Sequence, residues 1–205
     1  MTRSPSFAGV ILAAGESSRM GTDKALLPWP PAPIGLPSKG TFLSAAIRTL
    51  LLSTDFVVVV AGGNEDAIKP VAYAEGASVI VNPDPTRGQF SSLQMGVHEV
   101  LNRGRDAAII TLVDRPPAND ATIQILRNAF ESSGENIWAV IPQFSGKHGH
   151  PYIAGRELIE AFLQAPPSSN AREVEHAHQD RMAYIDVNDP NVALNVNTPD
   201  DYAKL

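Results

Sequence analysis

The sequence contains no cysteine among its 205 residues. Disulfides, thiolate zinc sites, iron–sulfur clusters and a cysteine nucleophile are therefore excluded. The chain also has little positive charge, because 16 Lys and Arg stand against 22 Asp and Glu and give a formal net charge of −6. Nucleic-acid binding usually needs a basic face, so we expect no nucleic-acid partner. Small anionic substrates stay open, since a few well-placed cations suffice to bind them.

Long apolar runs are missing as well. The longest apolar stretches, residues 56–61 and 107–113, fall far short of the ~20 residues that a membrane-spanning helix needs. The start of the chain combines a short apolar run with the segment Gly-Glu-Ser-Ser-Arg from Gly15, which does not resemble a signal-peptide cleavage site. We therefore predict a cytoplasmic protein without a membrane partner.

The apolar content is ordinary at 43%, and the length suits one domain spanning residues 1–205. Short β-branched runs predict strands that are buried on both faces, at residues 9–12, 56–60, 78–81, 107–112, 137–141 and 183–187. Apolar side chains on one helical face predict helices at residues 41–52, 90–101, 121–130 and 157–163. The alternation predicts an α/β fold with three layers, α/β/α, around a mostly parallel sheet.

A glycine-rich loop follows the first predicted strand. Small residues at Ala13, Ala14 and Gly15 let backbone amides approach a ligand, and Arg19 and Lys24 add cations to the same loop. Backbone amides, a guanidinium fork and an ammonium suit a polyphosphate. The spacing matches neither the dinucleotide-binding fingerprint nor the P-loop, so a plain turn with a surface Arg and Lys is the alternative.

Further polar groups stand at predicted strand and helix ends. Asp114 ends the apolar run 107–113, and a carboxylate at the carboxyl end of a strand faces the ligand crevice of an open α/β sheet, where it suits Mg²⁺. Ser91 and Ser92 follow the strand at 78–81 and are candidates for a helix N-cap. Thr198, followed by proline and two acids, predicts another N-cap.

Together these segments resemble the MobA/MocA-like nucleotidyltransferases, the family that attaches a nucleotide to molybdopterin. The matching segments occur in family order and are LAAGESSRMGTDKALLP from Leu12, GQFSSLQMG from Gly88, LVDRPP from Leu112 and NVNTPDD from Asn195. The resemblance covers about residues 7–202 and implies the Rossmann-like, nucleotide-diphospho-sugar transferase-like fold. It also implies an enzyme whose substrate is a nucleoside triphosphate.

The resemblance further implies roles for individual residues. In the nucleotide site, the implied residues are Leu12, Ala13, Ala14, Gly15, Arg19, Lys24, Asn82, Ser91, Ser92 and Leu93. In catalysis, they are Arg19, Lys24 and Asp114. As ligands of Mg²⁺ or Mn²⁺, they are Asp114 and Asn197. Arg87, in the loop before the second matching segment, also faces the site in this interpretation.

The segment Gly-Lys-His-Gly-His-Pro from Gly146 brings two histidines close together. A zinc site is disfavoured, because no cysteine and no nearby acid completes it. The resemblance implies instead that a Gly-His-Pro loop lines the acceptor side. His150, Lys147, His148 and Arg172 are then candidates for contacts with an anionic pterin phosphate, and a surface position on a helix is the alternative for Arg172.

The implied reaction transfers CMP from CTP to the phosphate of molybdopterin and releases pyrophosphate. CTP is favoured because Ala14 narrows the space for a purine where guanylyl-transferring relatives usually have glycine. A guanylyltransferase and a sugar- or polyol-phosphate nucleotidyltransferase are alternatives. So is a non-catalytic carrier or maturation factor for a molybdoenzyme partner. Val113 in place of the family glycine, Arg115, and a proline-rich insertion at 28–39 would fit the carrier.

Overall fold

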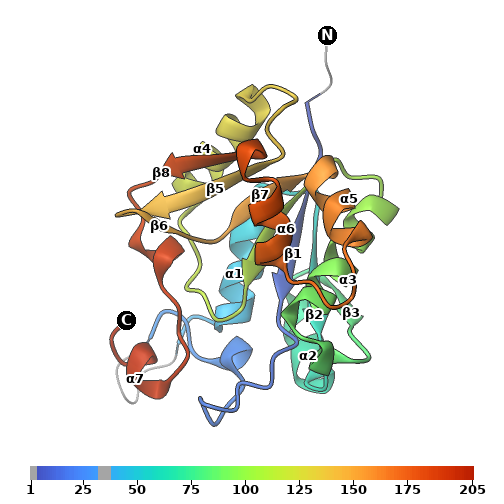
Figure 1. The fold of residues 1–205 in the computed structure, drawn as a ribbon. Coiled ribbons are helices and arrows are strands. Elements are labelled where there is room, and N and C mark those ends of the chain that lie inside the picture. The colour runs from blue at the N-terminus through green and yellow to red at the C-terminus, as the bar shows by residue number, and fades with distance from the viewer. Residues whose placement is uncertain (1–3, 32–37) are drawn as a thin grey trace.

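The computed structural model describes residues 4–31 and 38–205. Within these residues, eight strands form one sheet in the order β3-β2-β1-β4-β7-β5-β6, and β8 pairs with β5 off this path (Figure 1). The strands are β1 (Phe7–Leu12), β2 (Phe56–Ala61), β3 (Ser78–Val81), β4 (Ala107–Leu112), β5 (Ala139–Phe144), β6 (Lys147–His148), β7 (Tyr152–Gly155) and β8 (Met182–Asp186).

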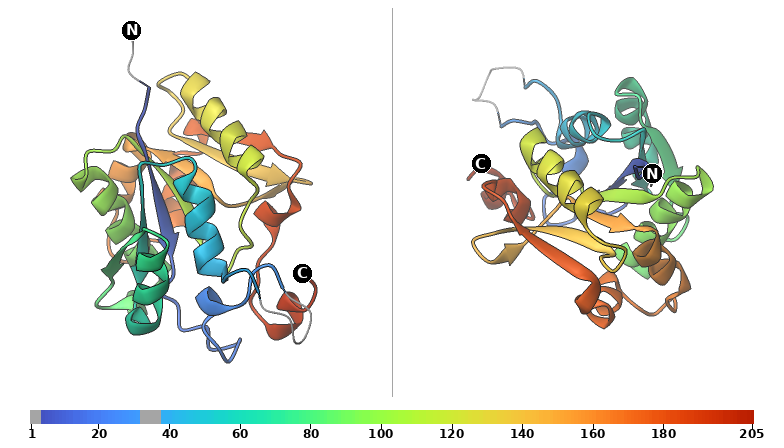
Figure 2. Two further views of the ribbon diagram at one scale, coloured as in Figure 1. Left: turned by 180° about the vertical axis from the view of Figure 1, so that it is seen from behind. Right: turned by 90° about the horizontal axis from the view of Figure 1, so that it is seen from above.

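Helices cover both faces of this sheet. They are α1 (Phe42–Leu51), α2 (Glu65–Ala74), α3 (Gln89–Asn102), α4 (Asp120–Ser132), α5 (Arg156–Gln164), α6 (Ala171–Ala177) and α7 (Pro199–Tyr202). One core lies under α1, α2 and α4, which Figure 2 shows on one side of the sheet. A second core lies under α3 and α5 on the opposite side. The predicted three-layer α/β/α fold is therefore confirmed.

The sheet divides into two halves of different construction. β3, β2, β1 and β4 are parallel neighbours, whereas β7 runs antiparallel to both β4 and β5. In β1, Phe7 and Ile11 point into the first core and Val10 and Leu12 into the second. This division explains why the strand reads as a continuous apolar run, since a strand covered on both faces has no polar side.

The structure has each predicted strand and helix to within three residues at either end, and it adds elements that the sequence pattern did not show. β7 has four residues, of which only Ile153 is β-branched, whereas the equally short β3 has three β-branched residues and was predicted. α2 contains Pro70, a residue that normally marks a helix end. In the part of the chain that the structure describes, no helix has the length and apolar character of a membrane span.

Candidate active site

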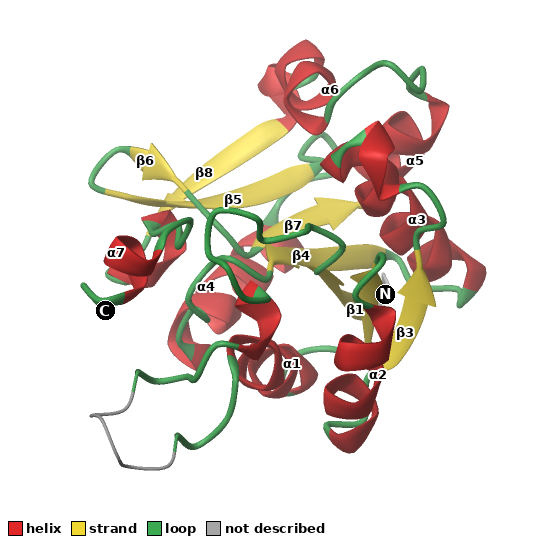
Figure 3. Cartoon of the chain, turned by 90° about the horizontal axis from the view of Figure 1, so that it is seen from below, coloured by secondary structure: helices red, strands yellow, loops and turns green. Residues whose placement is uncertain are grey.

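Four charged or amide side chains from three distant segments meet at the carboxyl ends of β1 and β4. Lys24 Nζ donates to Asp114 Oδ2 at 3.2 Å and to Asn197 Oδ1 at 3.0 Å. Arg19 Nη2 reaches the same Asn197 oxygen at 3.4 Å. We call these four residues the phosphate cluster. Figure 3 looks onto this edge of the sheet, with α7 beside it.

The loop after β1 is held by its own short-range hydrogen bonds and by the next strand. Asp23 caps a 3-10 turn at Lys24–Leu26 by accepting from the Ala25 amide at 2.9 Å. Asn64, just after β2, donates to the Ala13 carbonyl at 2.9 Å and to Asp23 Oδ2 at 2.6 Å. The sequence analysis missed Asn64, although its place at the carboxyl end of a parallel strand was a signal.

The C-terminal segment brings Asn197 to Asp114. The Val196 amide donates to the Asp114 carbonyl at 2.9 Å. Thr198 is the N-cap of α7, as predicted, and Asp201 Oδ2 accepts from the amides of Asn197 and Thr198 at 3.0 and 2.9 Å. These bonds to backbone amides lower the pKa of Asp201 and fix the direction of Asn197.

The phosphate cluster suits a divalent cation. Asp114 Oδ1 is buried and has no hydrogen-bond partner in the described chain, which leaves a carboxylate oxygen free for a ligand. No group of three or more His, Cys, Asp or Glu able to hold a metal occurs among the described residues. Mg²⁺ nevertheless fits one carboxylate and one amide oxygen, because it usually keeps several waters and takes phosphate oxygens from the substrate.

The candidate base-contact residues gather at the start of α3. Asn82 Nδ2 donates to Ser91 Oγ and to Ser92 Oγ, both at 2.9 Å, and all three residues are buried. The N-cap prediction for the two serines is wrong, because α3 begins at Gln89 with Gly88 as its cap. Gly88 takes a φ of 94°, which starts the helix earlier than the serines.

Two cavities flank these residues. A small one of about 110 Å³ is lined by Leu12, Ala14, Gly15, Pro85, Gly88, Gln89 and Ser92. A larger one of about 810 Å³ includes Leu12, Arg87 and Leu93 from the nucleotide side together with His148, His150 and Arg172 from the acceptor side. The structure therefore brings members of both predicted groups to one cavity, although most of the predicted nucleotide-site residues do not line it. Lys147 is exposed and does not line this cavity.

A third cavity of about 310 Å³ adjoins the large one and shares six residues with it: Arg115, His148, His150, Tyr152, Arg172 and Glu175. The Gly-His-Pro loop is fixed here, since the His150 amide donates to the Val192 carbonyl at 3.0 Å. A Cβ atom on Gly149 would lie 2.1 Å from that same oxygen, so only glycine fits this close approach.

Burial shifts the pKa values of several groups in this shared wall. Burial, with the positive charge of Arg115, lowers the pKa of His150 to about 3. Burial raises the pKa of Glu175 to about 7, against the opposing effects of a hydrogen bond from Tyr152 and the charge of Arg172. Tyr152 and Glu175 were not predicted as site residues from the sequence, although Tyr152 directly follows the Gly-His-Pro loop.

The structure shows where two departures from the family pattern lie, namely Val113 and the proline-rich insertion at 28–39. Val113 packs into the core under α1 and α4 and lines none of the cavities above. Residues 32–37 of the proline-rich insertion at 28–39 lie outside the described residues. The described start of the insertion is anchored, since Trp29 packs edge-on against Phe42 at 5.0 Å and the Tyr202 hydroxyl donates to the Pro28 carbonyl at 2.8 Å.

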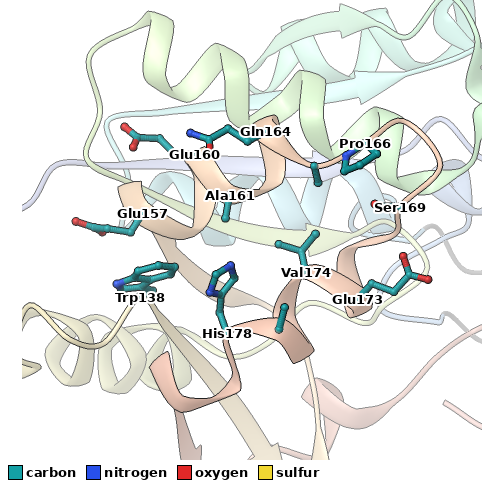
Figure 4. A pocket seen from close by; sticks show the side chains of 12 residues that line it. Trp138, Glu157, Glu160, Ala161, Gln164, Pro166, Ser169, Glu173, Val174 and His178 are labelled. Atoms are coloured by element: carbon teal, nitrogen blue, oxygen red, sulfur yellow. The ribbon is translucent and has the colours of Figure 1, made fainter.

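Another cavity, of about 630 Å³, lies between α5 and α6 and shares Ser169 with the large cavity (Figure 4). It contains Trp138 and His178, whose rings are 4.8 Å apart, and the glutamates Glu157, Glu160 and Glu173. None of the predicted site residues lines it. α6 thus separates two cavities, with Glu173 on one side and Glu175 on the other.

The fold and the phosphate cluster define a nucleotidyltransferase of the nucleotide-diphospho-sugar transferase fold. Residues 9–182 match the model of the MobA-like NTP transferase domain, and the chain belongs to this family. It is 29% identical over 199 residues to the molybdenum cofactor cytidylyltransferase of Escherichia coli, covering 94% of this chain and 92% of that protein. It is 27% identical over 208 residues to the molybdenum cofactor guanylyltransferase of Xanthomonas euvesicatoria, covering 100% and 97%.

Among solved structures, the protein Rv0371c of Mycobacterium tuberculosis superposes with a TM-score of 0.80 at 24% identity, covering 99% of this chain and 98% of that one. A second structure of that protein is a complex with manganese and gives a TM-score of 0.76 at 22% identity, covering 98% and 97%. At this level of identity, the likeness shows the fold alone.

Proposed function

We propose that this enzyme transfers CMP from CTP to the terminal phosphate of a molybdopterin-type acceptor and releases pyrophosphate. One observation carries the proposal: Lys24 donates hydrogen bonds to both Asp114 and Asn197. These bonds bring an ammonium group together with two oxygen atoms that could bind a metal ion, at the carboxyl edge of the sheet. The similarity to the cytidylyltransferase of Escherichia coli and to the guanylyltransferase of Xanthomonas euvesicatoria supports the choice of acceptor. A molybdoenzyme is then the recipient of the product.

Each residue of the phosphate cluster has a place in this reaction. An oxygen of the acceptor phosphate attacks the α-phosphorus, and the bond to the β-phosphate oxygen breaks. Arg19 and Lys24 stabilise the charge that develops on the departing pyrophosphate. Asp114 and Asn197 would hold Mg²⁺ or Mn²⁺, whose charge neutralises phosphate oxygens. The manganese complex of the mycobacterial protein supports a divalent metal. No side chain becomes covalently modified.

The preference for CTP rests on Ala14. This residue lines the small cavity between the first loop and α3. A Cβ atom on Gly62 would lie 2.8 Å from the Ala14 carbonyl, so the Ala14 backbone is closely packed against the loop after β2 and cannot retreat from a base. A pyrimidine is the smaller base and fits this confined space better than a purine.

Nucleotide binding tests the proposal first. We expect thermal stabilisation by CTP with Mg²⁺, by about 2.7 kcal/mol at 100 times the dissociation constant, and less by GTP, ATP or UTP. A GTP-selective shift would move the enzyme to guanylyl transfer. Pyrophosphate release with CTP and molybdopterin then tests the reaction. Nucleotide binding without pyrophosphate release would indicate a carrier, and release with a sugar or polyol phosphate would overturn the acceptor.

A further inference from the structure

The wall shared by the two acceptor-side cavities contains a carboxylate that the proposed reaction does not use. Glu175 lies on α6 and lines both cavities. It accepts a hydrogen bond from the hydroxyl of Tyr152, a buried residue of β7. Arg172, one turn earlier on α6, lines both cavities as well and is close enough for its charge to lower the pKa of Glu175. In its ionised form this partly buried side chain lines the cavity with spare acceptor capacity, and hydrogen bonds from N–H donors favour that form.

The same cavity has a flat aromatic face. The rings of His148 and Tyr184 stack at 4.2 Å with an interplanar angle of 18°, and both residues line the smaller cavity. His150, whose ring meets Tyr152 edge-on at 5.4 Å, has a buried Nδ1 atom without a hydrogen-bond partner in the described chain. Aromatic faces and a few polar groups are the usual means of binding a planar heterocycle.

α6 places Glu175 by a defined local structure. Asn170 and Glu173 form a capping box at its start, with hydrogen bonds of 3.0 and 3.2 Å. Residues two apart on a helix face different directions. Glu173 therefore borders the cavity between α5 and α6, whereas Glu175 borders the acceptor-side cavities.

We propose that Glu175 determines specificity by accepting the paired N–H donors of a 2-amino-4-oxopyrimidine ring. The N3–H and the 2-amino N–H of such a ring point in the same direction, so one carboxylate can accept hydrogen bonds from both. Two N–H groups of a guanidinium pair with a carboxylate in the same way. Arg172 and Arg115 border the same space and suit a phosphate attached to the ring. The ring is present both in a pterin and in guanine, and the experiment separates these sources. This inference rests on the proposed function for the identity of the acceptor.

Pterin and lumazine provide the test, because they differ only in a 2-amino against a 2-oxo group. We expect the wild-type protein to bind pterin at least about tenfold more tightly than lumazine in a fluorescence titration. The reason is that the 2-oxo group of lumazine is a hydrogen-bond acceptor and would face the carboxylate of Glu175, which is also an acceptor. Glu175→Gln presents one acceptor and one donor, which match lumazine. The preference should therefore reverse in this variant, an outcome that a merely structural role for Glu175 would not produce.

Glu173→Gln is the matched control on the same helix, and it should retain the preference for pterin because glutamine also completes a capping box. Glu175→Asp provides a second variant, which keeps the carboxylate and should keep the preference with weaker binding. Two outcomes would exclude pterin as the ring that Glu175 binds: equal binding of pterin and lumazine by the wild-type protein, or an unchanged preference in Glu175→Gln. The proposal would then hold only if the comparison of GTP with XTP, described next, shows a preference that depends on Glu175.

GTP and XTP carry the same 2-amino to 2-oxo change on a nucleotide. If Glu175→Gln reverses the preference between GTP and XTP but leaves pterin unaffected, the ring that Glu175 binds is the nucleotide base. If it reverses only the pterin preference, the ring belongs to the acceptor. If it changes neither, the proposal fails. All these titrations measure binding without turnover, so failure of CMP transfer would refute the proposed function while leaving the result for Glu175 intact.

Discussion

The phosphate cluster and the acceptor-side wall differ in how they hold charge. Lys24 and Asp114 pair as opposite charges, and their side chains are 12% and 23% exposed. In the wall formed by Arg115, His150, Tyr152 and Glu175, burial shifts the pKa of each of these four groups. The comparison suggests a division of labour. In the proposed reaction the first cluster neutralises phosphate charge, and in the proposed recognition of a ring the second presents groups whose pKa values are shifted by burial.

The largest effect should come from breaking the phosphate cluster. We expect Asp114→Ala and Lys24→Ala each to lower turnover by at least roughly 10²–10³, because each removes a group that stabilises charge in the transition state. Initial rates of pyrophosphate release measure this effect. Lys69→Ala, which removes an ion pair with Glu65 on α2, is the control and should retain turnover. Near-normal rates in both site variants would mean that the phosphates bind elsewhere.

Removing divalent metal should be comparably severe. We expect EDTA to abolish turnover by the wild-type enzyme and added Mg²⁺ to restore it, because Asp114 and Asn197 lose the cation that they are proposed to hold. Asn197→Asp should retain metal-dependent turnover, whereas Asn197→Ala should need more Mg²⁺ for half-maximal rate. Full activity in EDTA would contradict the metal assignment.

The burial of His150 in the acceptor-side wall should make the stability of the protein depend on pH. His150 is neutral in the fold with a pKa of about 3, against 6.5 when free. The unfolded chain therefore binds the extra proton, and His150 contributes stability that is present above pH 6.5 and is lost as pH falls toward 3. We expect the difference in unfolding free energy between wild type and His150→Asn to shrink by roughly 4 kcal/mol between pH 7 and pH 3.5.

Urea unfolding at several pH values measures this difference. Acid destabilises many proteins through other groups, so only the difference between the two proteins is informative. A constant difference across the range would show that His150 titrates alike in the folded and unfolded states.

A smaller effect should distinguish the nucleotide side. Ala14→Gly removes one methyl group from the wall of the small cavity. We expect the ratio of CTP to GTP affinity to fall by about tenfold, in line with the effect of one methylene in a binding pocket. Titration of both nucleotides gives the ratio. An unchanged ratio would mean that the base does not contact Ala14.

The smallest effect concerns the insertion. Tyr202→Phe removes the hydrogen bond to the Pro28 carbonyl, and Tyr202 also contacts the ring of Phe42. Since phenylalanine keeps the ring contact, we expect a loss of stability of only about 0.5–1.5 kcal/mol and no change in nucleotide affinity. A large loss of CTP affinity would show that the first residues of the insertion, which Tyr202 holds in place, contribute to the nucleotide site.

The sequence by itself determined the parallel half of the fold and the members of the phosphate cluster. Buried parallel strands are continuous apolar runs, and a ligand of such a sheet lies just past their carboxyl ends, so Lys24 and Asp114 stood out by position. Asn197 was found by resemblance, and the structure brings it to Asp114 as expected.

The tertiary structure alone decided that Tyr152 and Glu175 join the predicted His150 in the acceptor-side wall. β7 joins the sheet between β4 and β5 by antiparallel pairing, and α6 then brings Glu175 to Tyr152 from more than twenty positions along the chain. Neither event leaves a local pattern. β7 has a single β-branched residue, Ile153, whereas the equally short β3 has three, and a glutamate on a short helix looks like any solvated one. The protonation states of His150 and Glu175 follow from burial, which depends on what the whole chain packs around them.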